Sequence, residues 1–160
     1  MAIASNPLLD SYQCRYLPLT LYRVDYPGAQ TSYNECGGFN AASDLEPQDT
    51  STLRKAVANH LRWRCKIPSP FISAFDDQKQ AESWAQRWSK NHGEDCDIVK
   101  IRVEEEDEVV VFRVRDLVRY LDMYLPSIDP SWYHSEYLFL HRIPAELFVP
   151  YNDVHLSMRA

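Results

Sequence analysis

Phe71-Ile72-Ser73-Ala74-Phe75 is the stretch that most restricts the fold of this chain. Short apolar runs bounded by turn-forming residues predict buried β-strands, and here Pro70 precedes the run. Asp76 or Asp77 can cap a helix that follows at once and extends to about Asn91. The apolar residues of this helix recur at helical spacing and are expected in the core: Ala81, Trp84, Ala85 and Trp88. A strand followed directly by an amphipathic helix is therefore expected near the middle of the chain.

On both sides of this unit, short strands and helices follow one another without regular β-α-β alternation. β-forming residues predict strands over 19–24, 97–103, 108–114, 136–142 and 147–150. Periodicity and capping predict helices from Thr50 or Ser51 to about Trp63 and over 116–125, with a single helical turn after Pro144. Loops are expected over 25–48 and 126–130, a hairpin turn over 104–107, and an extended segment over 1–17. This order predicts an α+β fold with a mainly antiparallel sheet.

The length and charge of the chain argue against several classes of protein. The chain has 160 residues, so we expect a single domain over residues 19–160 after an N-terminal extension over residues 1–18. Its formal net charge is −6 and no stretch gathers lysine and arginine, which argues against general binding of nucleic acid or anionic membranes. The longest apolar runs are far too short to span a membrane.

Targeting signals, cysteines and metal motifs give mainly negative indications. Residues 1–10 hold no basic segment followed by an apolar run, so we expect a cytoplasmic protein with its four cysteines reduced. The five histidines lack the spacing of a metal site, so no metal is expected. Cys65 and His60 could form a thiol nucleophile and its base, but a histidine on a helix face and an unrelated loop cysteine are the better interpretation.

Three polar residues lie within predicted apolar strands. Arg23 follows Leu21-Tyr22, Ser73 is centred in the 71–75 strand, and Glu136 begins a strand that leads to Ile143-Pro144. A buried arginine needs an anionic partner, and a buried hydroxyl or carboxylate needs hydrogen bonds. Each residue also has a purely structural interpretation: a surface ion pair for Arg23, a satisfied core hydroxyl for Ser73 and a strand-edge charge for Glu136.

Taken together and in order, the three pieces resemble the sequence blocks of the cholera-toxin-like ADP-ribosyltransferases. The first block of that family is a strand with Leu-Tyr-Arg, then Asp, Pro and Gly-Gly, and it is similar to Leu21–Asp25 with Pro27 and Gly37-Gly38. The second is an aromatic residue, an aliphatic residue and a serine before a helix, as in Phe71-Ile72-Ser73. The third is a glutamate followed seven residues later by Ile-Pro, as in Glu136 and Ile143-Pro144. The resemblance covers about residues 19–150.

The resemblance implies a fold, a substrate and a set of site residues. The family has a split core of two antiparallel sheets with flanking helices, and it binds NAD in a cleft. By this resemblance Glu136 stabilises an oxocarbenium-like transition state, Ser73 orients Glu136, and Arg23 holds the phosphates or ribose of NAD. An aromatic residue would help to form an apolar slot for nicotinamide, and the candidates are Phe71, Phe75 and Tyr137.

His134 marks a departure from the arginine-modifying members of the family. Those members carry Glu-x-Glu in the third block, whereas this chain has His134-Ser135-Glu136. The second block also continues with Ala74-Phe75 rather than Thr-Ser. Residues two apart in a strand point to the same face, so His134 is expected beside Glu136. It would contact NAD there, or an acceptor other than arginine, because a partly charged histidine attracts a cationic acceptor poorly. Two alternatives are a base toward water and a loop histidine with no role.

The implied activity is mono-ADP-ribosyl transfer from NAD to an acceptor that we expect to be a protein. Two alternatives stay open at this point. One is glycohydrolysis of NAD, with water as the acceptor. The other is a catalytically degenerate domain that keeps the fold and binds a partner protein.

Overall fold

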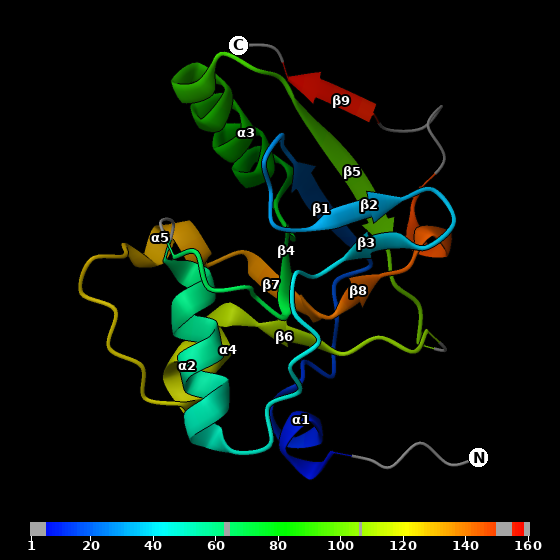
Figure 1. Cartoon of the computed structure of the whole chain (residues 1–160). Helices are drawn as coiled ribbons and strands as arrows, with labels where there is room; N and C mark the ends of the chain where they lie inside the picture. The colour runs from blue at the N-terminus through cyan, green and yellow to red at the C-terminus, as the bar shows by residue number, and fades with distance from the viewer. Residues whose placement is uncertain (1–5, 63–64, 106, 150–154, 159–160) are drawn as a thin grey trace.

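The computed structural model describes residues 6–62, 65–105 and 107–149 in full, and the backbone of residues 155–158. The strands form two antiparallel sheets (Figure 1). The large sheet has the order β6 (Val111–Arg113), β7 (Glu136–Leu140), β4 (Phe71–Phe75), β1 (Thr20–Asp25), β5 (Cys96–Arg102) and β9 (His155–Met158). The small sheet has the order β2 (Ser32–Asn34), β3 (Gly38–Asn40) and β8 (Arg142–Ile143). The expected α+β class with a split, antiparallel two-sheet core and flanking helices is confirmed.

Aspartate side chains fix where the two long helices begin. The N-cap of α2 (Thr50–Leu61) is Asp49, whose carboxylate accepts a hydrogen bond from the backbone N–H of Thr52 at 2.7 Å, so the expected capping by Thr50 or Ser51 is wrong. Asp77 caps α3 (Gln78–His92), as expected, and the helix ends at Gly93 in the left-handed conformation. The expected end of α2 near Trp63 lies outside the described residues.

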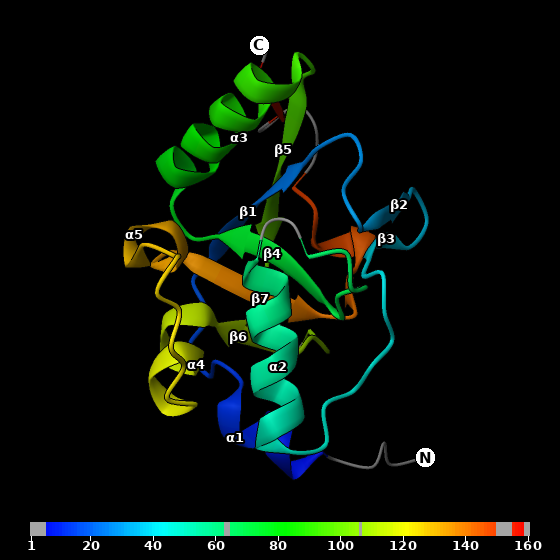
Figure 2. The ribbon, with the colours of Figure 1, turned by 60° about the vertical axis from the view of Figure 1, so that its left-hand side comes forward.

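The alternating side chains of β4 divide the core into two faces. Phe71 packs with residues of α2, and Phe75 packs with residues of α3, so these two rings face the helices. Ile72 and Ala74 point the other way, into a cluster that includes Phe39 of the small sheet. In Figure 2, α2 lies in front of β7 and β6. Position 73 therefore lies on the face that the helices cover.

The expected core positions of α3 are confirmed. Ala81 and Ala85 are fully buried and Trp88 is 5% exposed, and all three pack in one cluster with Phe75. Trp84 is partly buried and packs against the same cluster.

Strand pairing differs from the expected hairpin over 97–103 and 108–114. Glu104 and Glu105 are exposed, and the N–H of Asp107 donates to the carbonyl oxygen of Glu104 at 3.0 Å, as expected for a turn. However, β5 pairs with β1 and β9, whereas β6 pairs with β7 across the sheet. Each strand has its partner far away in the sequence, which local strand-and-turn patterns do not reveal.

The expected strand over 136–142 is divided between the two sheets. His141 has a φ of +68° and separates β7, in the large sheet, from β8, in the small one. The expected helical turn after Pro144 is present as η1 (Ala145–Leu147). Only an isolated bridge, between Phe148 and Ile101, lies in the expected strand over 147–150, whose last residue is outside the described part.

Other expected boundaries also need correction. The segment expected to be extended contains α1 (Pro7–Tyr12), which buries Leu9 against the core. The long 25–48 loop contains the β2–β3 hairpin, whose first strand is exposed and too short to show a pattern. The helix expected over 116–125 is α4 (Val114–Tyr120), and a further short helix, α5 (Pro130–Tyr133), precedes β7. β9 was not expected.

The described residues also bear on the expectations for membrane spans and cysteines. Among the helices in the described ranges, none is both long enough and apolar enough to cross a bilayer. Cys14, Cys36, Cys65 and Cys96 are free cysteines.

Only glycine fits at position 38, where β3 lies close to the backbone of β8 and η1. A substitution there tests how the small sheet is packed. Its φ is +85°, and a Cβ atom there would lie 2.6 Å from the backbone nitrogen of Ala145 and closer still to the carbonyl oxygen of Ile143. We expect Gly38→Ala to lower the free energy of unfolding by about 3 kcal/mol or more, from backbone strain and overpacking. Urea unfolding measures this, with Gly37→Ala as the control because a Cβ there meets nothing within 4 Å. Equal stabilities of the two variants would contradict the packing described.

Candidate functional site

Ser73 and Glu136 meet because β4 and β7 are neighbours in the large sheet. Phe75 is paired with Glu136 and Ser73 with Leu138, so both polar side chains lie on the face that α2 covers. The Ser73 hydroxyl donates a hydrogen bond to Oε2 of Glu136 at 2.7 Å. Glu136 is only 9% exposed. The interpretation of Glu136 as a strand-edge surface charge is therefore wrong.

Arg23 reaches the same place from β1, on the other side of β4. One terminal nitrogen donates to the backbone carbonyl oxygen of Ser73 at 3.0 Å, and the other donates to the Thr31 hydroxyl at 2.8 Å. The guanidinium carbon lies 5.6 Å from the centre of the Phe39 ring. Arg23 is 6% exposed, so it is not a surface ion pair. Its Nε is buried and has no hydrogen-bond partner among the described residues.

His60 of α2 completes this polar cluster, although its sequence position indicated only a histidine on a helix face. Its Nε2 lies 2.7 Å from the Ser73 hydroxyl oxygen, and its Nδ1 lies 2.5 Å from the Ser69 hydroxyl oxygen. Both ring nitrogens thus contact serine hydroxyls rather than the thiol of Cys65. Its edge contacts the Phe71 ring, with the centroids 5.9 Å apart. The available signal was a histidine on an otherwise apolar helix face, in a chain with a serine in a buried strand.

Burial and the Arg23 charge set the protonation of the cluster. Burial raises the pKa of Glu136 to about 7, although the Ser73 hydrogen bond and the Arg23 charge both lower it. Burial and the nearby Arg23 charge lower the pKa of His60 to about 4. Burial also lowers the pKa of Arg23. Near neutral pH the cluster thus contains a neutral histidine and a carboxylate that can gain or lose a proton.

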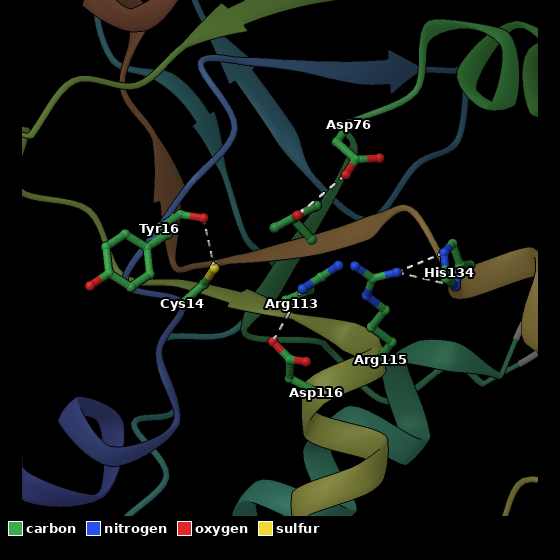
Figure 3. Close-up of polar contacts among 8 residues, drawn as sticks. Cys14, Tyr16, Asp76, Arg113, Arg115, Asp116 and His134 are labelled. Atoms are coloured by element: carbon green, nitrogen blue, oxygen red, sulfur yellow. Dashed lines mark hydrogen bonds and ion pairs between the residues drawn. The ribbon is translucent and has the colours of Figure 1, made fainter.

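His134 lies outside this cluster. It is exposed and follows α5 with helical backbone angles, because the strand begins only at Glu136. The expectation that His134 lies beside Glu136 assumed that both belong to one strand, and this assumption is wrong. Figure 3 shows Arg115 pointing at His134, and a terminal nitrogen of Arg115 lies 2.7 Å from Nε2 of His134.

The three aromatic candidates for a nicotinamide slot are core residues. Phe71, Phe75 and Tyr137 are 1%, 4% and 3% exposed. Phe75 is the cross-strand neighbour of Glu136, but its ring packs in the cluster under α3. The Tyr137 hydroxyl donates to the Asp76 carboxylate at 3.3 Å. A cofactor-binding role for Phe75 stays a prediction.

Metal ligation has no visible basis in the described ranges. No group of three or more histidine, cysteine, aspartate and glutamate side chains is placed there to hold a metal ion. The polar cluster itself offers hydroxyls, an imidazole, a carboxylate and a guanidinium.

The opposite pKa shifts of Glu136 and His60 predict opposite effects on stability. Glu136 has a raised pKa, so its contribution is present below about pH 4.5 and is lost as the pH rises through 7. His60 has a lowered pKa, so its contribution is present above about pH 6.5 and is lost as the pH falls through 4. In the parent protein the two effects largely cancel between about pH 4.5 and 6.5.

Single variants separate the two effects. Relative to the parent, we expect the free energy of unfolding of Glu136→Gln to rise by about 2 kcal/mol from pH 4.5 to 6.5, and that of His60→Gln to fall by about as much. Urea unfolding at the two pH values measures this, with Glu146→Gln as an exposed control. If the free energy of unfolding had the same pH dependence in the parent and in all three variants, the burial of Glu136 and His60 would be contradicted.

Comparison with solved structures supports the fold. The solved structure named EcPltA aligns with a TM-score of 0.60 over 88% of this chain and 82% of that chain, at 15% sequence identity. EcPltA is ADP-ribosyltransferase-like, so the chain has an ADP-ribosyltransferase-like fold. At this identity the similarity concerns the fold alone.

Sequence comparisons place the chain in a family without assigning it an activity. No curated protein matches the chain. Residues 16–150, which include Arg23, His60, Ser73 and Glu136, match one family over most of the chain. The chain therefore belongs to the family described as "Domain of unknown function (DUF7587)".

Proposed function

We propose that this chain is an NAD-dependent mono-ADP-ribosyltransferase of the cholera-toxin-like class. The observation that carries the proposal is the hydrogen bond from Ser73 to Glu136 at 2.7 Å, with Arg23 bonded to the carbonyl oxygen of Ser73 at 3.0 Å. These are the residues that the sequence resemblance selects, and they come from three strands of an ADP-ribosyltransferase-like fold. The fold places these three strands side by side, but it does not require hydrogen-bonded polar residues at these positions.

The proposed reaction breaks the bond between C1′ of the ribose and the nicotinamide nitrogen. The electron pair of that bond leaves with nicotinamide, which departs as a neutral molecule, and positive charge develops on the ribose. An ionised Glu136 would stabilise that charge, as carboxylates do in glycoside hydrolysis. The acceptor then bonds to C1′ and loses a proton. Glu136 could take this proton, because its pKa of about 7 leaves it partly ionised at neutral pH.

Arg23 would bind the phosphates or the ribose of NAD. Its buried Nε has no hydrogen-bond partner among the described residues, so it can still donate to an anionic ligand. A buried donor without a partner is costly, and binding such a ligand would remove that cost. The planar guanidinium suits phosphate because it donates two parallel hydrogen bonds.

The acceptor that we propose is a protein group other than arginine. The residue at the position of the family's acceptor-side glutamate is His134, and its neighbour is the cationic Arg115 rather than a carboxylate. The positive charge of Arg115 would repel a guanidinium group. Water is the alternative acceptor, which would make the protein an NAD glycohydrolase.

Glu136→Gln tests the proposed reaction. The substitution removes the charge and keeps the shape, so we expect nicotinamide release from NAD to fall on the order of a hundredfold. Glu146→Gln should cleave NAD at the parent rate, because Glu146 is exposed on η1. Label retained on protein identifies a transferase, and release without label identifies a glycohydrolase. Absence of both NAD binding and nicotinamide release in the parent would favour a non-catalytic interaction domain.

Arg23→Lys tests the binding role of the guanidinium. Lysine keeps the charge but cannot form a two-pronged phosphate contact, so we expect about tenfold weaker NAD binding with the fold unchanged. Calorimetric titration with NAD measures the affinity, and circular dichroism reports the fold. Arg119→Lys, at an exposed position of α4, is the matched control. Equal affinities for NAD would place Arg23 outside the binding site.

A further inference from the structure

We propose that His60 and Ser69 are positioning residues that fix the hydroxyl of Ser73 so that its hydrogen points to Glu136. The observation is an unbroken hydrogen-bonded series. The oxygen of Ser69 lies 2.5 Å from Nδ1 of His60, Nε2 of His60 lies 2.7 Å from the oxygen of Ser73, and that oxygen lies 2.7 Å from Oε2 of Glu136. The inference deepens the proposed function, since it rests on the role given there to Glu136.

Counting hydrogens gives the series a direction. An ionised Glu136 only accepts, so the single hydrogen of the Ser73 hydroxyl must point to it. The Ser73 oxygen then accepts from Nε2 of His60, which must carry the one hydrogen of a neutral imidazole. Nδ1 has none left, so it accepts from the Ser69 hydroxyl. The opposite tautomer would leave Nε2 and Glu136 competing for one hydrogen.

Ser69 is held firmly enough to select the tautomer of His60. Its backbone N–H donates to the side-chain oxygen of Gln30 at 3.0 Å, and its carbonyl oxygen accepts from the N–H of Ser43 at 3.1 Å. Pro68 and Pro70 flank it and restrict the backbone on both sides.

The hydroxyl of Ser69 has a second fixed contact. Its oxygen accepts a hydrogen bond from the backbone N–H of Phe71 at 3.1 Å. A backbone N–H only donates, so this contact occupies an acceptor site of the Ser69 oxygen and leaves the hydroxyl hydrogen for His60. Ser69 also lines a groove of about 500 Å³ beside α2, where water can replace its hydroxyl in a variant.

Arg23 is the charged group beside this series. Its positive charge lowers the pKa of both His60 and Glu136, so it favours a neutral imidazole next to an ionised carboxylate. When His60 is neutral and Glu136 is ionised, each hydrogen bond of the series can have only one direction.

Nitrogen-15 NMR of the histidines tests the direction without using any enzymatic activity. At pH 8, where most of Glu136 is ionised, we expect His60 to be neutral, with the proton on Nε2 and none on Nδ1. His60→Gln assigns the signals. A His60 that carries its proton on Nδ1 would overturn the proposal.

Ser69→Ala tests whether Ser69 imposes this state. Water in the groove can donate or accept, so only the contact with Ser73 still favours the Nε2–H tautomer, and we expect the preference of His60 for that tautomer to weaken. The pKa of Glu136 should then rise by roughly 1, because the carboxylate loses part of the Ser73 hydrogen bond. Carboxyl-carbon NMR titration measures that pKa. Ser69→Thr retains the hydroxyl and should restore both properties, and Ser51→Ala is the control at an exposed serine of α2.

An unchanged tautomer and an unchanged pKa of Glu136 in a folded Ser69→Ala variant would overturn the positioning role. If the parent cleaves NAD, the pH dependence of nicotinamide release should shift to higher pH in Ser69→Ala by the same amount as the pKa of Glu136. If the parent does not cleave NAD, the proposed function fails, while the tautomer and the pKa still decide the positioning role on their own.

Discussion

A carboxylate buried between a helix and a sheet is the constraint around which the polar residues of this fold are arranged. Removing the Glu136 charge from water is costly, and a raised pKa of about 7 records that cost. The cost is partly offset by one hydrogen bond from Ser73 and by the charge of Arg23. The same burial keeps His60 neutral, so the imidazole adds a hydrogen bond without adding a competing charge.

The topology of the large sheet makes this arrangement possible. β4 lies between β7 and β1, so Ser73 has Glu136 on one side and the Arg23 strand on the other. Alternation along β4 directs Ser73 to the face covered by α2, from which His60 reaches it. Residues that are distant in sequence are thus brought together by strand order rather than by any local motif.

Much of this arrangement could be predicted from the sequence, and the remainder has identifiable physical causes. β4, α3 and the class of fold have strong local patterns, and the sequence resemblance selected the three strand residues that meet in the structure. The partners of β5 and β6 were missed because their pairing is nonlocal. The division between β7 and β8 was missed because a single left-handed residue, His141, is an unusual place to change sheets. His60 was missed because only tertiary structure shows which serines its ring meets.

The polar cluster is the part of the sequence that folding does not require. The neighbours of Ser73 on β4 and of Glu136 on β7 are apolar residues that pack in the core. Apolar side chains of similar size at these polar positions would avoid the desolvation of a guanidinium and a carboxylate, and such replacements are often neutral or stabilising in other proteins. A fold that carries this cost in one place, with strongly shifted pKa values for a base and an acid, has the properties expected of a functional site. The Nε of Arg23 strengthens this argument, because it is a buried donor that has no acceptor among the described residues and is available to a ligand.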